Sequence, residues 1–480
     1  MPDVTINLDQ QGFIPLGTEA TNINFVAAFP SFNNLIAALA TKDERELGYM
    51  RVQSVTDWYA RLTSTYNTGW YVAGDTNDDG IIDDDEKESV NKTPNGSAAG
   101  NWPDGPADEW KAEWWAVHNY LRYGGTCIIA GPADNISSTE NLALETIENL
   151  FFDLDCVFTN DYIRNERIMS IANNRGNCIA VCPVIITGKL GSCGNPKNVL
   201  GLPSSTDLSS SPSKLTYHIA GQKLHLGTSQ SYIIGDETSD NLISTPLSSD
   251  AAGCMARTTA SSSPFGSPAG TERGRILDVV RLEYTPTNSD ITCLSGDGNK
   301  VNHTRTFQGE GTLIFSDKTG RRESQSDPAI FDYVNVSRTF IYLNRTVSTV
   351  ARKYLFERND ATNRSAFVNT ATPILRSVLS AGGISEYSIV CDSVNNPQTV
   401  IDNNGFVVDL QIKPTRSVQN ITLRFTAKAG TQAIPSTSTG SGTGSTSTTG
   451  GSRTTPTAAS PSITPSSTTS SSGSAGSGGY

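Results

Sequence analysis

The stretch WWAVHNYLRYGGTCIIA, residues 114–130, decides the fold class. Large apolar side chains recur here at spacings of four, three and four, on one face of a helix that we expect to begin near residue 107: Trp110, Trp114, Val117 and Leu121. Gly124 and Gly125 predict the end of this helix, and the apolar run over 126–130 predicts a buried strand directly after it. A helix followed at once by a buried strand is typical of α/β proteins.

The same alternation continues downstream. We expect a helix near Ser137 and Glu140, which form a possible capping box, then a strand over 156–158, a helix over 165–174 and a strand over 178–186. This order favours a mostly parallel sheet layered with helices. Residues 107–275 are therefore predicted to form an α/β domain within a mixed α+β chain. Its last part, from about residue 203, is rich in Ser, Thr, Gly and Pro and predicts long loops with isolated strands.

Residues 276–413 are predicted to form a C-terminal domain around one amphipathic helix. Its apolar side chains recur at steps of three, four, three and four: Phe340, Leu343, Val347, Val350 and Tyr354. Arg338, Arg345 and Arg352 recur every seven residues, and at roughly 100° per residue they centre on the opposite face. We expect the apolar face to pack and the other to present three aligned charges, either as a solvated outer face or as a docking strip for an acidic partner.

Both ends of the folded region predict short strands that cannot cover their own faces. The first strand alternates Val4, Ile6 and Leu8 with polar residues, and the last alternates Ile421, Leu423 and Phe425 in the same way. Strands this short need a sheet edge supplied from elsewhere. We assign residues 1–20 to an N-terminal β-arm, 414–428 to a C-terminal β-arm, and the Ser/Thr/Gly-rich residues 429–480 to a disordered tail.

Six collinear motifs resemble those of the tail sheath proteins of contractile phages and related injection systems. The most specific is DYVNVSRTFIYLNRTV at 332–347, and the resemblance covers roughly 110–428. The other motifs are WWAVHNYLRYGGTCIIA at 114–130, SSDAAGCMARTTASSSPFGSPAGTERGRI at 248–276, FERND at 356–360, PILRSVLSAGGI at 373–384 and the run at 391–425. Ser337 replaces one arginine of the family's usual pair, and the first hundred residues match the family poorly.

The resemblance implies a non-enzymatic, sheath-type multidomain subunit. Such subunits stack as six-fold rings around an inner tube, exchange β-arms with neighbouring subunits and contract to drive the tube through the host envelope. The implied partners are further copies of the chain, the inner tube protein, the baseplate and the tail terminator, in a virion assembled in the host cytoplasm. Because the family's C-terminal domain lies innermost, Arg338, Arg345 and Arg352 become candidates for tube contact. A phage tail and a phage-derived injection system both remain open.

An acidic loop over 75–86, DTNDDGIIDDDE, matches the calcium-loop pattern D-x-[DN]-x-[DN]-G-x₅-E. The predicted ligands are five side chains and one main-chain carbonyl: Asp75, Asn77, Asp79, Ile81 through its carbonyl, Asp83 and Glu86. A divalent cation would relieve the repulsion among these carboxylates, so we expect calcium to stiffen a loop within a peripheral region over 21–106. An empty acidic turn is the alternative.

The composition of the chain argues against several other classes of protein. The 480 residues carry a formal net charge of −12, which argues against nucleic acid as the main partner. No apolar run reaches the 18 or so residues of a membrane span, and the start MPDVTINLDQ lacks the features of a secretory signal. The eight cysteines lack CxxC spacing and several lie in apolar runs, so we expect buried reduced thiols rather than disulfides or a zinc site.

Two rival classes rest on local features. A calcium-stabilised cell-surface protein is favoured by the acidic loop and the Ser/Thr/Gly tail. A phosphatase-like hydrolase would rest on Asp317, whose surroundings SDKTG copy the core of an aspartyl-phosphate motif, a match that we interpret as accidental. The four histidines suggest no catalytic triad, and we expect them to be surface or hydrogen-bonded residues.

Overall fold

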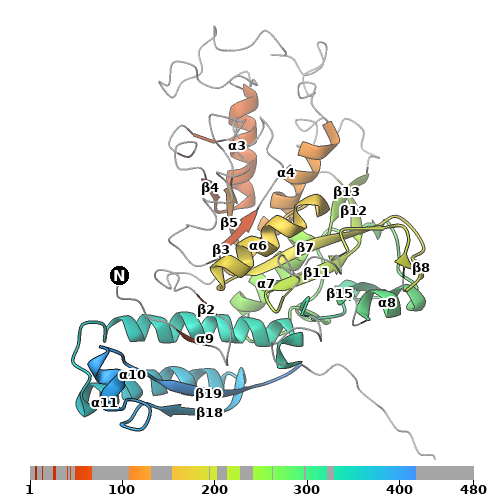
Figure 1. The fold of residues 1–480 in the computed structure, drawn as a ribbon. Coiled ribbons are helices and arrows are strands. Elements are labelled where there is room, and N and C mark those ends of the chain that lie inside the picture. The colour runs from red at the N-terminus through yellow and green to blue at the C-terminus, as the bar shows by residue number, and fades with distance from the viewer. Residues whose placement is uncertain are drawn as a thin grey trace, which may run out of the picture. The chain divides into compact units, whose positions relative to one another are not determined.

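The main sheet is mostly parallel, as the alternation of helices and strands predicts (Figure 1). Its strands follow in the order β15 (Val301–Asn302), β11 (Thr216–Ala220), β7 (Ile179–Ile186), β6 (Cys156–Phe158), β3 (Phe25–Ala28), β5 (Thr126–Ala130) and β4 (Tyr49–Val52). Every pairing along this order is parallel except that of β4 with β5. The strands predicted over 126–130, 156–158 and 178–186 are thereby confirmed, with β7 beginning one residue later than expected.

This computed structural model describes a defined set of residues, all of them in the unit formed by residues 1–419. The described residues are 6–7, 13–14, 25–28, 40–41, 44, 49–67, 107–130, 154–193, 195–202, 213–226, 242–261, 263–296, 299–321 and 329–417. The helix predicted near Ser137 and the tail over 429–480 lie outside them.

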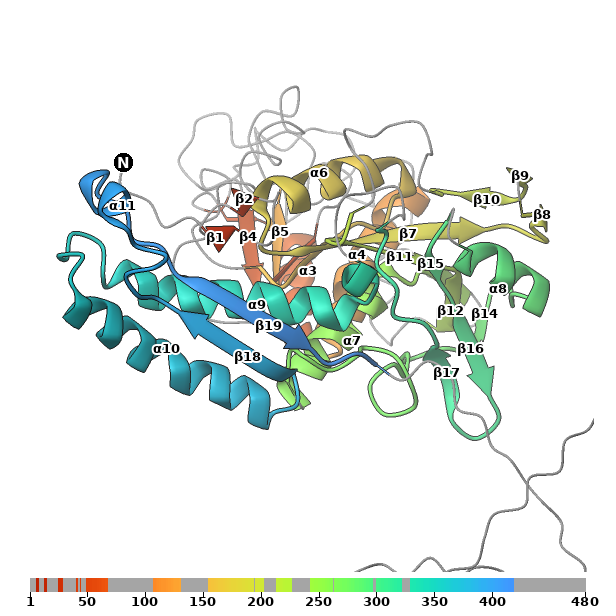
Figure 2. The same cartoon turned by 60° about the horizontal axis from the view of Figure 1, so that its bottom comes forward.

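Helices cover both faces of the sheet. Figure 2 shows α6 (Asn165–Arg175) over one face, and α4 (Ala107–Leu121) and α7 (Ser248–Ser261) over the other. The helix α3 (Val55–Asn67) contacts α4 through the stacked rings of Trp58 and Trp114. These rings belong to the largest buried cluster in the described part of the chain, which also holds Trp115, Tyr120 and Phe158. The helices predicted to begin near 107 and to span 165–174 are confirmed.

Residues 21–106 are more than the peripheral region that we predicted. The strand β3 lies in the middle of the main sheet, where Val26 is opposite Cys127 on one side and Cys156 on the other. The strand β4 and helix α3 come from the same segment. Because β3 is only four residues long and pairs with a strand on each side, it shows no alternation that would identify it in the sequence.

The long loops predicted for 203–275 are also wrong in part. Besides β11, this segment contains β12 (Gln222–Leu226) and β13 (Leu242–Pro246), which form an antiparallel sheet with β14 (Arg281–Leu282), and it contains the helix α7. Most of α7 is buried, including Ser248, Ser249, Gly253 and three of its four alanines. Small side chains let this helix pack closely, and they also gave the sequence its loop-like composition.

The prediction of reduced thiols is correct for six cysteines and wrong for two. Cys193, beside the hairpin of β8 (Gly191–Ser192) and β9 (Asn195–Pro196), is disulfide-bonded to Cys293 in α8 (Asn288–Ser295). The six free cysteines are all buried: Cys127, Cys156, Cys178, Cys182, Cys254 and Cys391. The bonded pair is separated by 100 residues, so spacing could not reveal it.

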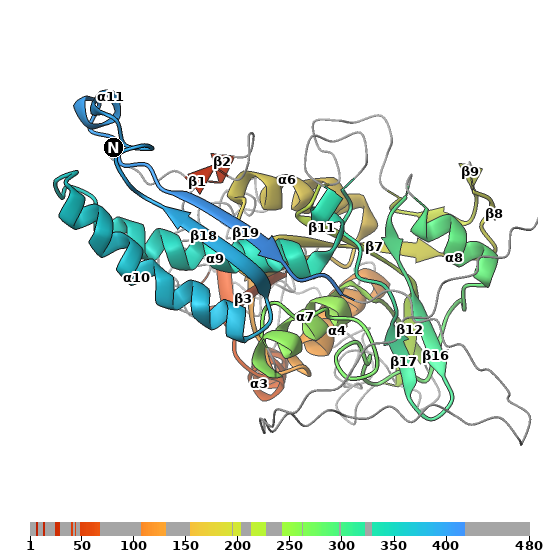
Figure 3. The ribbon, with the colours of Figure 1, turned by 90° about the horizontal axis from the view of Figure 1, so that it is seen from below.

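The C-terminal domain is built on α9 (Val334–Arg352), which follows the 3-10 helix η5 (Ala329–Asp332). Figure 3 shows α10 (Ala361–Ser380), β18 (Ile384–Val390) and β19 (Asp409–Pro414) gathered along α9, with α11 (Gln398–Asp402) at one end. The hairpin β16 (Thr304–Phe307) and β17 (Gly311–Ile314) precedes this domain.

Candidate assembly interfaces

The apolar face of α9 forms the core of the C-terminal domain. Leu343 packs with Leu375 and Val378 of α10, and Val347 and Val350 pack with Phe367. On the other side of this core, apolar side chains of β18 and β19 contact the same clusters: Tyr387, Ile389, Leu410 and Ile412. The predicted apolar stripe of α9 is confirmed, and its burial fixes the two strands against the helix pair.

The opposite face of α9 is not a solvent-facing strip, contrary to our prediction. Arg338 is 2% exposed, and its Nη2 lies 2.7 Å from Asp155 Oδ2 and 3.1 Å from the carbonyl oxygen of Met255. Arg345 is 8% exposed and donates to the carbonyl oxygens of Leu154 and Asn177. Both arginines therefore join α9 to the α/β domain, and neither can serve as the exposed tube contact that we predicted. Arg352, at the C-terminal end of α9, is half-buried.

The amino-acid composition of α9 indicates that this second face is also buried. The helix contains no acidic residue and no lysine, although an outer face of its length normally carries both. Small polar residues flank the arginines instead, and all are buried: Ser337, Thr339, Asn344 and Ser348. A helix with one apolar and one small polar face packs on both sides, and here the second partner is the α/β domain.

The sheet of β18 and β19 has two open edges. Among the described residues each strand pairs only with the other, from Ile384 opposite Pro414 to Val390 opposite Asp409. The outer backbone N–H and C=O groups of both strands can therefore accept a further strand. One face of the sheet covers the domain core, while Glu386 and Ser388 on the other face are exposed. This sheet is the candidate site for strand addition.

The predicted arms are only partly described. Ile6 of β1 (Ile6–Asn7) lies opposite Ile14 of β2 (Phe13–Ile14) in a short antiparallel pairing within the chain. Val4 and Leu8 lie outside the described residues, as does the whole predicted strand with Ile421, Leu423 and Phe425. Exchange of either arm between copies therefore stays a prediction.

The base of the C-terminal arm is anchored. Thr415 donates its N–H to Gly383 and accepts a bond from Asn335 Nδ2 at 3.1 Å. Ser417 Oγ lies 2.6 Å from Asp317 Oδ2, and Asp317 itself is buried. Asp317, on which the hydrolase alternative rests, therefore contacts the chain segment that leads into the arm.

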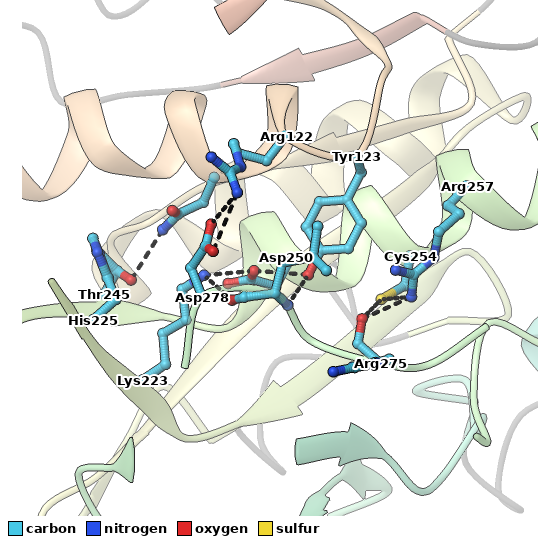
Figure 4. Close-up of polar contacts among 12 residues, drawn as sticks. Arg122, Tyr123, Lys223, His225, Thr245, Asp250, Cys254, Arg257, Arg275 and Asp278 are labelled. Carbon is cyan, nitrogen blue, oxygen red and sulfur yellow. Dashed lines mark hydrogen bonds and ion pairs between the residues drawn. The ribbon is translucent and has the colours of Figure 1, made fainter. Parts of the chain in front are cut away.

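A buried ion pair stiffens the α/β domain (Figure 4). Lys223 Nζ lies 2.8 Å from Asp250 Oδ1, and Tyr123 donates its hydroxyl to the same oxygen at 2.9 Å. Burial raises the pKa of Asp250, although Lys223 and Tyr123 act in the opposite direction. The pair connects β12 with α7, and Tyr123 follows α4. At the edge of this network Arg122 forms a half-exposed ion pair with Asp278. We interpret the network as structural, because Lys223 and Tyr123 both bind Asp250 Oδ1 and no ligand is needed to hold them together, although Asp250 Oδ2 has no hydrogen-bond partner among the described residues.

The histidines are more buried than we predicted. All four are under a tenth exposed: His118, His218, His225 and His303. His118 stacks on Trp114, and burial lowers the pKa of His118 to about 3. Burial likewise lowers the pKa of His225 to about 4. The imidazoles of His118 and His225 therefore stay neutral in the folded protein at neutral pH.

The predicted calcium ligands lie outside the described residues, as the whole loop over 75–86 does. Within the described part of the chain no group of His, Cys, Asp and Glu residues has the arrangement of a metal site. No described helix is long and apolar enough to cross a membrane. Calcium binding by Asp75, Asn77, Asp79, Ile81, Asp83 and Glu86 therefore stays a prediction.

Comparison with solved structures defines the class of fold. A chain of the anti-feeding prophage baseplate matches with a TM-score of 0.57 and 14% identity, over 89% of this chain and 99% of that chain. A chain of the contracted PVC sheath complex, from an extracellular contractile injection system, matches with a TM-score of 0.55 and 14% identity, over 89% and 98%. The fold is therefore that of contractile sheath proteins.

Sequence comparison leads to a particular family. Residues 326–428 match the model of the phage tail sheath C-terminal domain. The tail sheath protein of Vibrio phage KVP40 is 31% identical over 275 residues, which are 55% of this chain and 39% of that protein. The tail sheath protein of Enterobacteria phage T4 is 38% identical over 184 residues, which are 38% of this chain and 27% of that protein. The resemblance drawn from the motifs is confirmed, and the matches span less than half the length of these relatives.

Proposed function

We propose that this chain is the structural subunit of a contractile tail sheath. Copies polymerise as stacked six-fold rings around an inner tube and contract to drive that tube through the host envelope. The observation that carries the proposal is the two-stranded sheet of β18 and β19, both edges of which are open among the described residues, in the domain that matches the sheath family model. Its partners are further copies of itself, the inner tube protein, the baseplate and the tail terminator.

Strand addition supplies the links between copies. Each main-chain hydrogen bond across an open edge contributes about 0.5–1.5 kcal/mol, and the alternation of side chains sets the register. The arm beyond Ser417 is the candidate donor strand, because the chain is anchored by Asp317 and Asn335 where it leaves β19. A head-to-tail contact whose rotation does not close gives an open helical polymer, which is the symmetry of a tube.

Contraction requires bodies that keep their shape while the links between them bend. The buried pair of Lys223 and Asp250 stiffens the α/β domain, and Arg338 and Arg345 of α9 join that domain to the C-terminal domain. The arms then act as hinges, and new contacts between rigid bodies release the free energy that drives the movement. The curated relatives come from phage tails, which favours a virion component assembled in the host cytoplasm, whereas the similar folds favour the alternative of an injection-system sheath.

Truncation tests the proposal directly. The purified full chain should form hollow ridged cylinders in negative stain, and a chain that ends at residue 428 should do the same. A chain that ends at residue 417 lacks the donor strand and should stay dispersed while its circular dichroism spectrum keeps the helical signal. Cylinders from that shorter chain would contradict the role of the arm, and a planar lattice of the full chain would favour the surface-protein alternative.

We also propose that the acidic loop binds calcium, as a stiffening element rather than a catalytic one. The support is the agreement of residues 75–86 with every specified position of the calcium-loop pattern. Calorimetric titration of the full chain should show one calcium site, and the double variant Asp75→Asn, Glu86→Gln should lose it. Equal heats from both proteins would contradict the proposal.

A further inference from the structure

Two exposed apolar side chains stand at the end of the C-terminal domain where α9 ends. Phe356 is 88% exposed, four residues after the end of α9, and Val394 is 83% exposed in the loop after β18. Asn359 donates to Asn396 at 3.4 Å, which joins the two loops. We call this surface, defined by Phe356, Glu357 and Val394, the apolar tip.

The apolar tip is held in a fixed conformation. Asn396 exchanges two hydrogen bonds of 2.8 Å with the backbone of Val407, and Asn359 Nδ2 donates to the carbonyl oxygen of Gly405 at 2.7 Å. Phe356 itself has a φ of 69°, in the left-handed region that side chains other than glycine rarely adopt. This conformation costs about 1 kcal/mol or more of conformational free energy and leaves an aromatic ring in water, so it does not stabilise the isolated subunit.

A cavity lies at the opposite end of α9. It encloses about 450 Å³, and its lining includes Phe265, Phe315 and Asn335 together with Arg273 and Arg416. Asn335 belongs to the first turn of α9, and a helix of that length spans roughly 28 Å at 1.5 Å per residue. Gly382 and Thr415, which also line the cavity, stand at the start of β18 and the end of β19. The apolar tip and the cavity are therefore near opposite ends of α9, whose course Figure 3 shows.

The cavity is chemically complementary to the tip. Phe265 and Phe315 offer ring surfaces, and Arg273 and the exposed Arg416 offer positive charge beside them. Asn335 is 5% exposed, and its Oδ1 has no hydrogen-bond partner while its Nδ2 donates to Thr415. An entering segment needs an apolar side chain, an adjacent acid and a backbone N–H donor. The dipeptide Phe356-Glu357 carries all three.

We propose that the apolar tip of one copy docks into this cavity on the next copy, head to tail. The ring of Phe356 enters between Phe265 and Phe315, and Glu357 meets Arg273 and Arg416. Because the two surfaces are different and lie near opposite ends of α9, the contact is heterologous and propagates instead of closing on a dimer. The inference rests on the proposed function in that it requires copies to meet in a polymer, and it adds a side-chain contact to the exchange of strands.

Site-specific cross-linking tests this contact in assembled protein. The double variant Glu357→Cys, Ser267→Cys places one thiol at the tip and one in the cavity lining, and a short bis-maleimide should give a ladder of covalent multimers. The matched control is Ile163→Cys, Ser267→Cys, because Ile163 is also exposed but belongs to the α/β domain. Cylinders that form normally and give no more cross-linking than this control would overturn the inference alone. Absence of cylinders from the unmodified chain would overturn the proposed function and the inference with it.

Charge exchange provides a second test that does not depend on cysteine placement. Glu357→Arg and Arg416→Glu should each raise the critical concentration for assembly about tenfold, since each places like charges together. The double variant Glu357→Arg, Arg416→Glu should restore most of that loss, because it re-forms an opposite pair. Both residues are exposed in the single chain, so neither change should affect its folding. Losses that add instead of cancelling would contradict the proposed pairing.

Discussion

Replacing Arg338 by methionine should destabilise the protein more than any change at an exposed arginine. The side chain of Arg338 is almost fully buried, and its guanidinium supplies the ion pair to Asp155 and the bonds to Met255 and Thr259. Arg338→Met removes these bonds and leaves the buried carboxylate of Asp155 without its cation. Breaking a buried pair in this way costs about 3–5 kcal/mol, whereas replacing both partners by apolar residues is close to neutral.

Urea unfolding of the full chain, followed by tryptophan fluorescence, measures this cost as the shift in midpoint multiplied by the slope. The double variant Arg338→Met, Asp155→Leu should recover most of the loss. The matched control is Arg376→Met on the exposed side of α10, which should cost less than about 1 kcal/mol. If Arg338→Met costs no more than Arg376→Met, or if the double variant is worse than the single one, the domain-joining role of Arg338 is wrong.

Three further predictions concern the α/β domain. Lowering the pH from 7 to 4 should reduce the free energy of unfolding by about 3 kcal/mol through His118. The imidazole of His118 has a pKa of about 6.5 in the unfolded chain and about 3 in the folded protein, so only the unfolded chain gains a proton over this range. Urea midpoints at the two pH values measure the loss, and His118→Gln should make it smaller. Cys193→Ser removes the disulfide to Cys293 and should lower the free energy of unfolding by about 2–4 kcal/mol. In the same urea assay a reductant should lower the unfolding midpoint of the parent protein but not that of this variant. Gly253→Ala should cost about 1–3 kcal/mol because its added carbon would lie 2.3 Å from a ring carbon of Tyr123; an unchanged melting temperature would contradict this packing.

Sequence reasoning succeeded where burial follows a local period. The apolar stripe of α4, the strand β5 and the helix α9 were predictable because the side chains that must be buried recur at spacings set by the backbone. The strand β3 was not, since it belongs to a run of five apolar residues, 25–29, that shows no alternation. The helix α7 was hidden for a different reason, because its small residues are as common in loops as in tightly packed helices.

The candidate site was harder to predict than the fold. Helical periodicity revealed that Arg338 and Arg345 share a face of α9, but it could not reveal what that face contacts. The partner of Arg338, Asp155, is 183 residues away in the sequence. The open edges of β18 and β19 and the cavity beside Asn335 likewise depend on which strands remain unpaired once the chain has folded. The motifs predicted only the family resemblance, and the most specific of them lies in this domain.

The central position of β3 matters for how the chain is made. This strand leaves the ribosome long before one of its two neighbours, β6, which is complete only when Phe158 has been added. At translation speeds of about 5–20 residues per second, the nascent chain must keep an apolar strand uncovered for roughly ten seconds. A stalled or truncated product would expose that edge permanently. Production of this protein at high level should therefore depend on chaperones that shield the growing N-terminal region.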